Sequence, residues 1–353
     1  MSKFNGKMLD GLVPYTAGEQ PKNMKFVKLN TNENPYSPSP KVAEVIANFD
    51  YSTLKLYPDP ESTELKCAIS QFYGVADDKI FCGNSSDEII AMAFMAFFSG
   101  KTIAFPDITY SFYPVWCDIF GVSKKIIPLK NDWTIDCENF PSDCGGLVIC
   151  NPNAPTGIAM TRAEMEKILQ KHPNALVLCD EAYIDFGGES SIELTGKYDN
   201  LLVVHTLSKS RCLAGARVGF AIGNAELIKS LNIVKNSFNS YTIDRLAMKI
   251  AVAAIEDREY FENCCKKVIG TRNWVTDELQ KSGFEVLPSS ANFIFAKPPK
   301  QFSAEKLYSD LKANGVLVRY WNKPKISDRL RISIGTDAEM KVLLDKVREI
   351  VGS

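Results

Sequence analysis

The sequence predicts an α/β protein with a mostly parallel central sheet covered by helices and a smaller C-terminal α/β domain. Short apolar runs, such as residues 146–150 and 201–204, alternate with stretches of helical periodicity, which is typical of strands buried on both faces by helices. Near residue 245 this alternation gives way to a long helical region, after which shorter strand and helix patterns resume. At 353 residues the chain is long enough to form two hydrophobic cores.

Residues 1–37 are expected to form an irregular N-terminal arm that joins the small domain or a partner subunit, because prolines and glycines interrupt any periodicity there. Ser39 followed by Pro40 is a typical helix start, so a helix is expected from here through Phe49. The segment 56–60 contains two prolines and is expected to be an extended turn.

The large domain is expected to span residues 38–245. Its predicted strands are the apolar runs at 80–82, 102–105, 125–127, 146–150, 176–179, 201–204 and 218–222. Its predicted helices lie near 62–73, from about 88, after Tyr110 and after the capping-box sequence at 161–164. Ligands of such sheets bind beyond the carboxyl ends of the strands, so polar residues at those ends are candidates for a site.

The small domain is expected to span residues 246–353. A helical region at about 243–281 leads into it, with strands predicted near 291–296, 316–320 and 330–334 and helices near 303–313 and 337–350. This renewed alternation of strands and helices indicates a second α/β unit.

Composition argues against several function classes. The net charge is −1, and no basic stripe or amphipathic basic arm indicates a nucleic acid or a membrane as partner. The longest apolar run, 89–98, is too short to cross a bilayer, and no apolar segment follows Lys3 and Lys7 as in a signal peptide. A cytoplasmic location is therefore expected. The ten cysteines and two histidines show no ligand spacing, so we expect buried thiols and no metal site.

Lys209 is the strongest candidate for a reactive residue, because it follows the predicted buried strand 201–204 closely. An ammonium group loses hydration in such a place, which lowers its pKa and frees the amine for Schiff-base chemistry. Ser208 and Arg217 nearby would suit a phosphate group. The alternative is a surface lysine in a glycine-containing turn.

Three other strand ends carry polar residues. The backbone amides of Ser86 and Asp87 would suit a phosphate at a helix start. The alternative is an ordinary N-cap followed by acidic residues in the first helical turn, which has the same sequence pattern. The segment 151–157 predicts a rigid turn. Asp180 would need a cationic partner if buried, such as a pyridinium nitrogen, and is otherwise a helix-capping residue. Its distance from Lys209 along the chain fits one strand–crossover–strand unit.

Together these motifs resemble the fold-type I aminotransferases that depend on pyridoxal 5'-phosphate (PLP), and among them the histidinol-phosphate aminotransferases. The resemblance runs through the segments 13–15, 29–35, 106–110, 319–320 and 330–336. It implies PLP as cofactor and a ping-pong transfer of the amino group from L-histidinol phosphate to 2-oxoglutarate, giving imidazole acetol phosphate and L-glutamate in histidine biosynthesis. Three alternatives stay open. They are an aromatic amino acid aminotransferase, a PLP decarboxylase of a phosphorylated amino acid and a PLP-binding regulatory protein.

The resemblance also implies roles for single residues around the cofactor. Lys209 would form the internal aldimine, Asp180 would pair with the pyridine nitrogen, and Tyr183 would bond the ring hydroxyl. Tyr110 would stack on the ring, although a core aromatic residue is the alternative. The cofactor phosphate would be held by Ser86, Asp87, Ser208 and Arg217.

Further residues would serve the substrate and the partner subunit. Tyr57 is similar to the tyrosine that reaches the other subunit's cofactor, which implies a homodimer with composite sites. Arg331 is similar to the arginine that binds the anionic end of the substrate, and Arg319 and Tyr15 to other residues on the substrate side. For Arg319 and Tyr15, ordinary polarity of an exposed strand or loop is the alternative.

One position departs from the family pattern. Many relatives have an asparagine that bonds the ring hydroxyl where this chain has Ala154, and an alanine side chain has no hydrogen-bonding group. Either Tyr183 suffices for that bond or Asn153 takes part in it.

Overall fold

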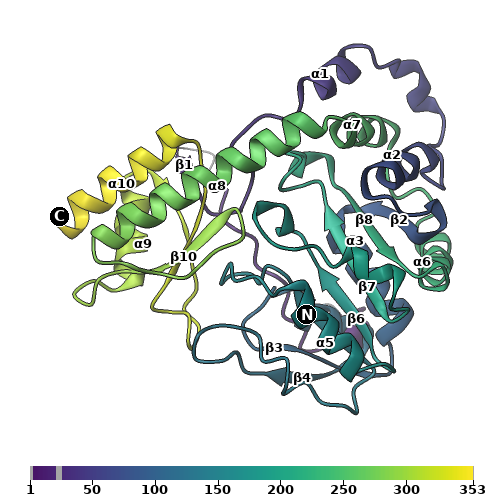
Figure 1. Cartoon of the computed structure of the whole chain (residues 1–353), viewed down its shortest axis with the longest axis horizontal. Coiled ribbons are helices and arrows are strands. Elements are labelled where there is room, and N and C mark those ends of the chain that lie inside the picture. Colours follow the sequence, from purple (N-terminus) through teal and green to yellow (C-terminus); the bar gives the residue numbers. More distant parts are fainter. Residues whose placement is uncertain (1–2, 21–25, 353) are drawn as a thin grey trace.

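The computed structural model describes residues 3–20 and 26–352. Figure 1 shows two unequal α/β parts side by side, with the long helix α8 (Arg258–Lys281) running between them. The larger part holds a seven-stranded sheet and the smaller part a four-stranded sheet. The predicted fold class is confirmed.

The large sheet is mostly parallel. Its strand order is β2 (Ile80–Asn84), β8 (Val218–Gly223), β7 (Leu201–Thr206), β6 (Leu176–Asp180), β5 (Gly146–Cys150), β3 (Thr102–Pro106) and β4 (Ser123–Ile127). Only β8 runs antiparallel to its neighbours. Every residue of β5, β7 and β8 is buried. That burial explains why the central strands read as continuous apolar runs.

Helices cover both faces of this sheet. They are α1 (Pro40–Ala47), α2 (Thr63–Tyr73), α3 (Ser85–Ala93), α4 (Tyr113–Phe120), α5 (Arg162–Lys171), α6 (Ala225–Phe238) and α7 (Arg245–Glu256). The predicted start signals are confirmed. The Ser39 side chain accepts a hydrogen bond from the amide of Lys41, and Thr161 and Glu164 form the capping box of α5. Short 3-10 or π turns lie at Lys7–Leu9, Tyr51–Lys55, Asp77–Lys79, Phe94–Phe98, Ile184–Phe186, Ile192–Gly196 and Ala214–Ala216.

Three features of the helices differ from the sequence prediction. Helix α3 begins at Ser85 rather than near Glu88, directly where β2 ends. The helical region 243–281 is two helices, because Asp257 ends α7 and its carboxylate accepts the amide of Tyr260 as the N-cap of α8. Helix α6 was not predicted.

The smaller part is built on an antiparallel sheet in the order β12 (Arg319–Tyr320), β13 (Leu330–Ser333), β10 (Phe293–Lys297) and β9 (Glu285–Val286). Its helices are α9 (Ala304–Ala313), α10 (Asp337–Val351) and part of α8. The arm is not wholly irregular. Its strand β1 (Val27–Lys28) pairs in parallel with β11 (Val316–Leu317), which attaches the arm to this part of the molecule.

The predicted domain boundary after residue 245 stays a prediction. Helix α7 packs against α1 and α2, and its buried residues, Ala251 among them, belong to the same apolar cluster as Val203 of β7. This packing favours a boundary near Asp257, where α8 begins.

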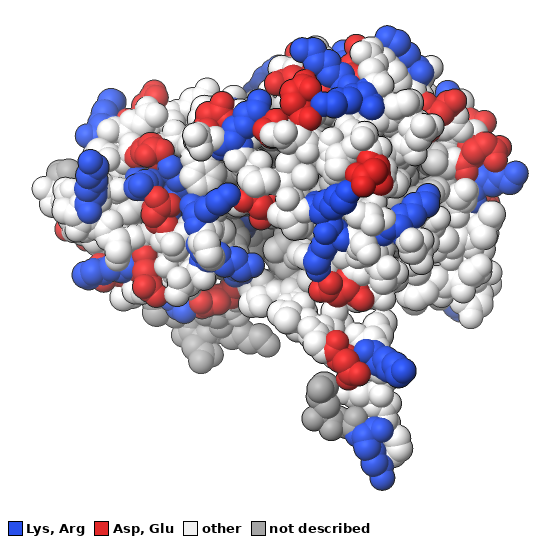
Figure 2. All heavy atoms as spheres, turned by 90° about the horizontal axis from the view of Figure 1, so that it is seen from below, with Lys and Arg blue, Asp and Glu red and all other residues white. Residues whose placement is uncertain are grey.

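The charged surface and the cysteines were the two features that the composition brought to attention. In the view of Figure 2, acidic and basic side chains are intermixed over the face shown. Across the described residues, no helix is both long and apolar enough to cross a membrane. All ten cysteines lie in the described ranges and are free thiols, seven of them buried.

Candidate active site

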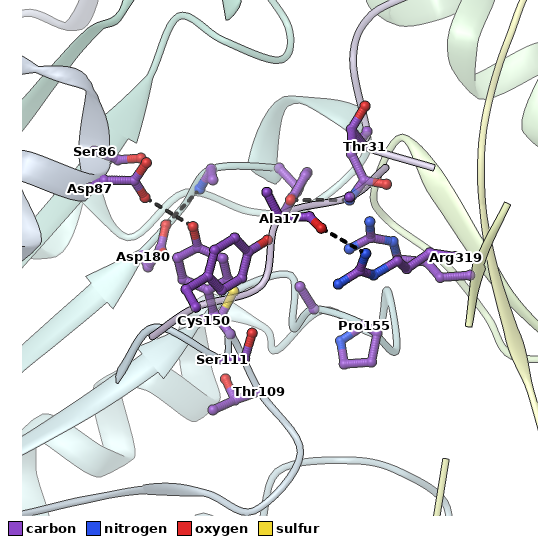
Figure 3. Close-up of a pocket in the computed structure, with 18 of the residues that line it drawn as sticks. Ala17, Thr31, Ser86, Asp87, Thr109, Ser111, Cys150, Pro155, Asp180 and Arg319 are labelled. Carbon is purple, nitrogen blue, oxygen red and sulfur yellow. Dashed lines mark hydrogen bonds between the residues drawn. The ribbon is translucent and has the colours of Figure 1, made fainter. Parts of the chain in front are cut away.

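A cavity of about 930 Å³ opens at the carboxyl ends of the central strands. Asp180 ends β6, and Lys209 follows β7. The arm adds Thr31 to the wall and the smaller part adds Arg331 and Arg319. Figure 3 shows Ser86, Asp87 and Asp180 on one side of this space and Arg319 opposite them. The sheet, the arm and the small sheet therefore build one site.

Lys209 lies inside this cavity and is not a surface lysine. Its Nζ donates to the carbonyl of Thr31 at 3.4 Å and lies 5.7 Å from the centre of the Tyr183 ring. Burial, and secondarily the nearby Arg331, lowers the pKa of Lys209 to about 8. No carboxylate in the described part of the chain forms an ion pair with it. The amine is therefore much closer to its neutral, nucleophilic form than an exposed lysine would be.

Asp180 is a buried carboxylate, and no cationic side chain among the described residues forms an ion pair with it. Its Oδ2 accepts the hydroxyl of Tyr113 at 2.8 Å and its Oδ1 accepts the amide of Ala182 at 3.2 Å. Burial raises the pKa of Asp180 to about 6, even though these hydrogen bonds favour the carboxylate. The α-helical N-cap alternative is wrong, because only a 3-10 turn, Ile184–Phe186, follows. A protonated ring nitrogen would supply the missing cation.

A cup of hydrogen-bond donors lies at the start of α3. The first amides of a helix have no partner within it, and the N-cap Asn84 makes no side-chain hydrogen bond to them. Strand β8 passes this point at very close range. A Cβ built on Gly219 would stand 2.6 Å from the backbone nitrogen of Ser86, so only glycine fits there. The approach brings the segments around Ser86 and Arg217 to one wall of the cavity.

Charged and hydroxyl groups complete this cup. Arg217 Nη2 lies 3.1 Å from Asp87 Oδ2, and the Tyr110 hydroxyl donates to Asp87 Oδ1 at 2.9 Å. The hydroxyl of Ser208 accepts a bond of 2.9 Å from Thr206. All of these residues line the same cavity, so the four predicted phosphate-side residues are brought together.

The opposite wall carries two arginines. Arg331 donates to the carbonyl of Asn30 at 2.8 Å, while its Nε is buried without a partner. Burial lowers the pKa of Arg331, and no described carboxylate pairs with it. Arg319 donates to the carbonyls of Thr16 and Ala17. Tyr15 stacks on Phe112 with ring centres 4.3 Å apart. A half-buried arginine whose buried Nε–H group is unused is suited to an anionic ligand.

Two predicted site residues lie elsewhere. Tyr57 is 76 % exposed, stacks on Tyr241 at 4.5 Å and does not line the cavity of its own chain. Asn153 does not line the cavity either, since its Nδ2 donates to the carbonyl of Ile108 and to Thr156 within the turn. This geometry does not support a ring contact by Asn153. Ala154 does line the cavity.

The residues present fit PLP. The cavity offers an amine of lowered pKa, a buried carboxylate without a cation beside it, and a cup of backbone donors at the start of α3. The cup lies so close to β8 that position 219 has no room for a Cβ. These groups line one cavity and match a ligand with an aldehyde, a ring nitrogen and a phosphate. Which residue makes which contact with that ligand stays a prediction.

Sequence reasoning missed two residues that contact the predicted ones. Tyr113 bonds Asp180, and Asn32 donates through Nδ2 to the hydroxyl of Tyr183 at 3.1 Å. The pair of tyrosines three residues apart was the available signal, because the chain turns there: the amide of Tyr113 donates to the carbonyl of Tyr110 at 3.3 Å, directly where α4 begins. Asn32 had no such signal, because its contact depends on the fold of the arm.

Comparisons with known proteins give one consistent result. The family model "Aminotransferase class I and II" matches residues 24–347. A histidinol-phosphate aminotransferase of Clostridium botulinum (strain 657 / Type Ba4) is 51% identical over 352 residues, 99% of each chain, and one of Clostridium acetobutylicum is 50% identical over 99% of this chain and 100% of its own. The crystal structure of histidinol-phosphate aminotransferase from Sinorhizobium meliloti in complex with pyridoxal-5'-phosphate has a TM-score of 0.85, at 22% identity, over 93% of this chain and 92% of that one.

Proposed function

The chain belongs to the class I and II aminotransferases, and on that premise we propose that it transfers the amino group of L-histidinol phosphate to 2-oxoglutarate in histidine biosynthesis. The products are imidazole acetol phosphate and L-glutamate. The observation that carries this substrate assignment is the 51% identity, over 99% of both chains, with a relative named for this reaction. The cofactor is PLP, as in the class as a whole.

Bound PLP supplies an electron sink for the negative charge that develops at the substrate's α-carbon. We propose that Asp180 holds a proton on the pyridine nitrogen, because the buried carboxylate is stabilised by a cation there. Lys209 would take the proton from the substrate's α-carbon as general base and then, as general acid, deliver it to the cofactor's C4' carbon. Its pKa of about 8 suits both roles near neutral pH.

Arg331 is proposed to bind the anionic end of both substrates. One pocket must accept the phosphate monoester of histidinol phosphate and a carboxylate of 2-oxoglutarate in turn. A guanidinium presents parallel N–H donors that match either anion, and Arg331 has an unused Nε. Arg319 and Tyr15 line the same side of the cavity and would contact the remainder of the substrate.

We further propose a homodimer with composite sites. The segment around Tyr57 presents exposed apolar side chains, with Tyr51 81 %, Leu54 59 % and Leu56 55 % exposed. Such a patch is typical of a protein interface. Tyr57 is remote from its own cavity, so it would contribute to the partner's. A cytoplasmic location stays a prediction.

The function is tested by mixing the purified, PLP-loaded protein with L-histidinol phosphate alone, then adding 2-oxoglutarate. We expect the visible absorbance of the bound cofactor to disappear with the first and to return with the second, with glutamate formed in equal amount to imidazole acetol phosphate. Response to phenylalanine or tyrosine without response to histidinol phosphate would instead assign an aromatic aminotransferase. Carbon dioxide release without need for 2-oxoglutarate would assign a decarboxylase.

A further inference from the structure

A short chain of hydrogen bonds connects strand β13 to the hydroxyl of Tyr183. The amide N–H of Asn32 donates to Ser333 Oγ at 2.8 Å, and Ser333 Oγ donates to Asn32 Oδ1 at 2.8 Å. Asn32 Nδ2 then donates to the Tyr183 hydroxyl at 3.1 Å. Asn32 is 2 % exposed, Ser333 3 % and Tyr183 9 %, so bulk water does not compete for these bonds.

The direction of each bond in this chain is fixed by its chemistry. A backbone N–H can only donate, so Ser333 accepts from Asn32 and must place its own proton elsewhere. The acceptor that the structure gives that proton is Asn32 Oδ1. The amide of Asn32 is thereby oriented with Nδ2 toward Tyr183, and an amide NH₂ only donates. The hydroxyl oxygen of Tyr183 is therefore an acceptor toward Asn32.

It follows that the Tyr183 proton points away from Asn32. Tyr183 lines the cavity, and no other described side chain accepts a bond from its hydroxyl. The proton is therefore available to a group inside the cavity. Ala154, on the same cavity wall, has no hydrogen-bonding side chain to assist.

We propose that Asn32 and Ser333 are positioning residues that force Tyr183 to act as the hydrogen-bond donor to the cofactor's ring oxygen. The inference rests on the proposed PLP site. It assigns to the arm and to β13, both outside the large sheet, a part in cofactor recognition. Asn32 itself is also held in place, since it adopts a left-handed φ of 55° and its carbonyl accepts from Asn292 Nδ2 at 3.0 Å.

Asn32→Asp reverses the direction of the last bond with almost no change in shape. At pH 8, with Lys209 and Arg331 nearby, the new carboxyl is expected to be ionised, so it accepts the Tyr183 proton and withdraws it from the cavity. We expect the dissociation constant of PLP, titrated into apoprotein, to rise about 10-fold, the usual effect of losing one hydrogen bond to a charged group. The visible band of the bound cofactor should also move.

The added charge itself acts on PLP, so the test is a double-mutant cycle with Tyr183→Phe. In the Phe background the carboxylate is present but no hydroxyl can be redirected. In the Tyr183→Phe background, Asn32→Asp should therefore raise the dissociation constant of PLP by a several-fold smaller factor than it does in the wild type. An equal loss in both backgrounds would overturn the proposal, since charge or packing would then explain it. Exposed Asn314→Asp, at the C-cap of α9, is the matched control and should leave the affinity unchanged.

If Asn32→Asp does not fold, Ser333→Ala can replace it in the same double-mutant cycle. This substitution removes the hydroxyl that donates to Asn32 Oδ1 and so orients the Asn32 side-chain amide. An affinity unaltered by Ser333→Ala would equally refute the proposal. PLP binding is measured without substrate. A wild type that binds PLP yet ignores histidinol phosphate would thus refute the proposed function alone.

Discussion

Tyr113 offers the sharpest test of how the site controls the charge of Asp180. Its hydroxyl is buried and donates to Asp180 Oδ2 at 2.8 Å. Tyr113→Phe removes this donor and keeps the ring, which packs edge-on against Phe105. A hydrogen bond to a charged group contributes about 1.5–3 kcal/mol, which corresponds to roughly 10- to 100-fold in the ionisation equilibrium of the carboxyl group. The pKa of Asp180 should therefore rise further above its present value of about 6.

The consequence is a pH-dependent loss of PLP affinity. At a pH below its pKa the Asp180 carboxyl group is mostly protonated. PLP is expected to bind the form of the protein in which this group is ionised, because only the carboxylate pairs with a protonated ring nitrogen. In the wild type, affinity should fall as the pH drops through about 6. In Tyr113→Phe the fall should begin at higher pH. Working from the ionised fractions, we expect a dissociation constant about 5- to 50-fold above wild type at pH 6 but less than about two-fold above it at pH 8.5.

The assay is titration of apoprotein with PLP between pH 5.5 and 9, followed by fluorescence. Tyr198→Phe is the matched control, because that hydroxyl bonds Glu166 away from the cavity. A ratio of affinities that is the same at every pH would refute the reasoning, since Tyr113 would then act through packing alone.

Three further outcomes are expected. Arg331→Ala should raise the KM for histidinol phosphate and for 2-oxoglutarate by about 10- to 100-fold, because each substrate loses one hydrogen bond between charged groups. The change in PLP affinity should be much smaller. A KM that changes for only one of the two substrates would contradict the shared pocket. Gly219→Ala should weaken PLP binding strongly, because its Cβ would press on Ser86 and displace the start of α3, whereas Gly196→Ala, which meets nothing within 4 Å, should not. Asp257→Ala should lower the free energy of unfolding by about 1–2 kcal/mol in chemical denaturation through loss of the α8 cap, and an unchanged value would show that the cap is dispensable.

Much of the fold was predictable because the central strands are buried on both faces. An apolar run such as 201–204 predicts a strand that is buried on both faces. The polar residue that follows such a run marks the carboxyl edge of the sheet. This reasoning predicts the positions of Asp180 and Lys209 from the sequence alone. Helix α6 carries a local start signal that the sequence prediction missed. Asn224 is a typical N-cap residue, and its side-chain oxygen accepts the backbone amide of Glu226.

Other features carry no local signal. Strand β1 has only two residues, and its pairing depends on a segment near the other end of the chain. The early start of α3 depends on Ser85 adopting a left-handed φ of 69°, which serine rarely does. The contact between Asn32 and Tyr183 likewise depends on tertiary structure. Sequence patterns report burial and turns, and they do not report which distant segments meet.

The attachment of the arm has a consequence for synthesis of the chain. Asn32 and Ser333, which meet at the wall of the cavity, are 301 residues apart in sequence. A chain emerging from the ribosome presents Lys209 long before β13 exists, so its amine is then neither enclosed nor depressed in pKa by Arg331. The cavity can therefore be closed only when translation is nearly complete. A chain that ends before β13 would carry Asp180 and Arg217 but lack the wall that Arg331 supplies, so Lys209 would keep its cofactor-side neighbours and lose its substrate-side ones.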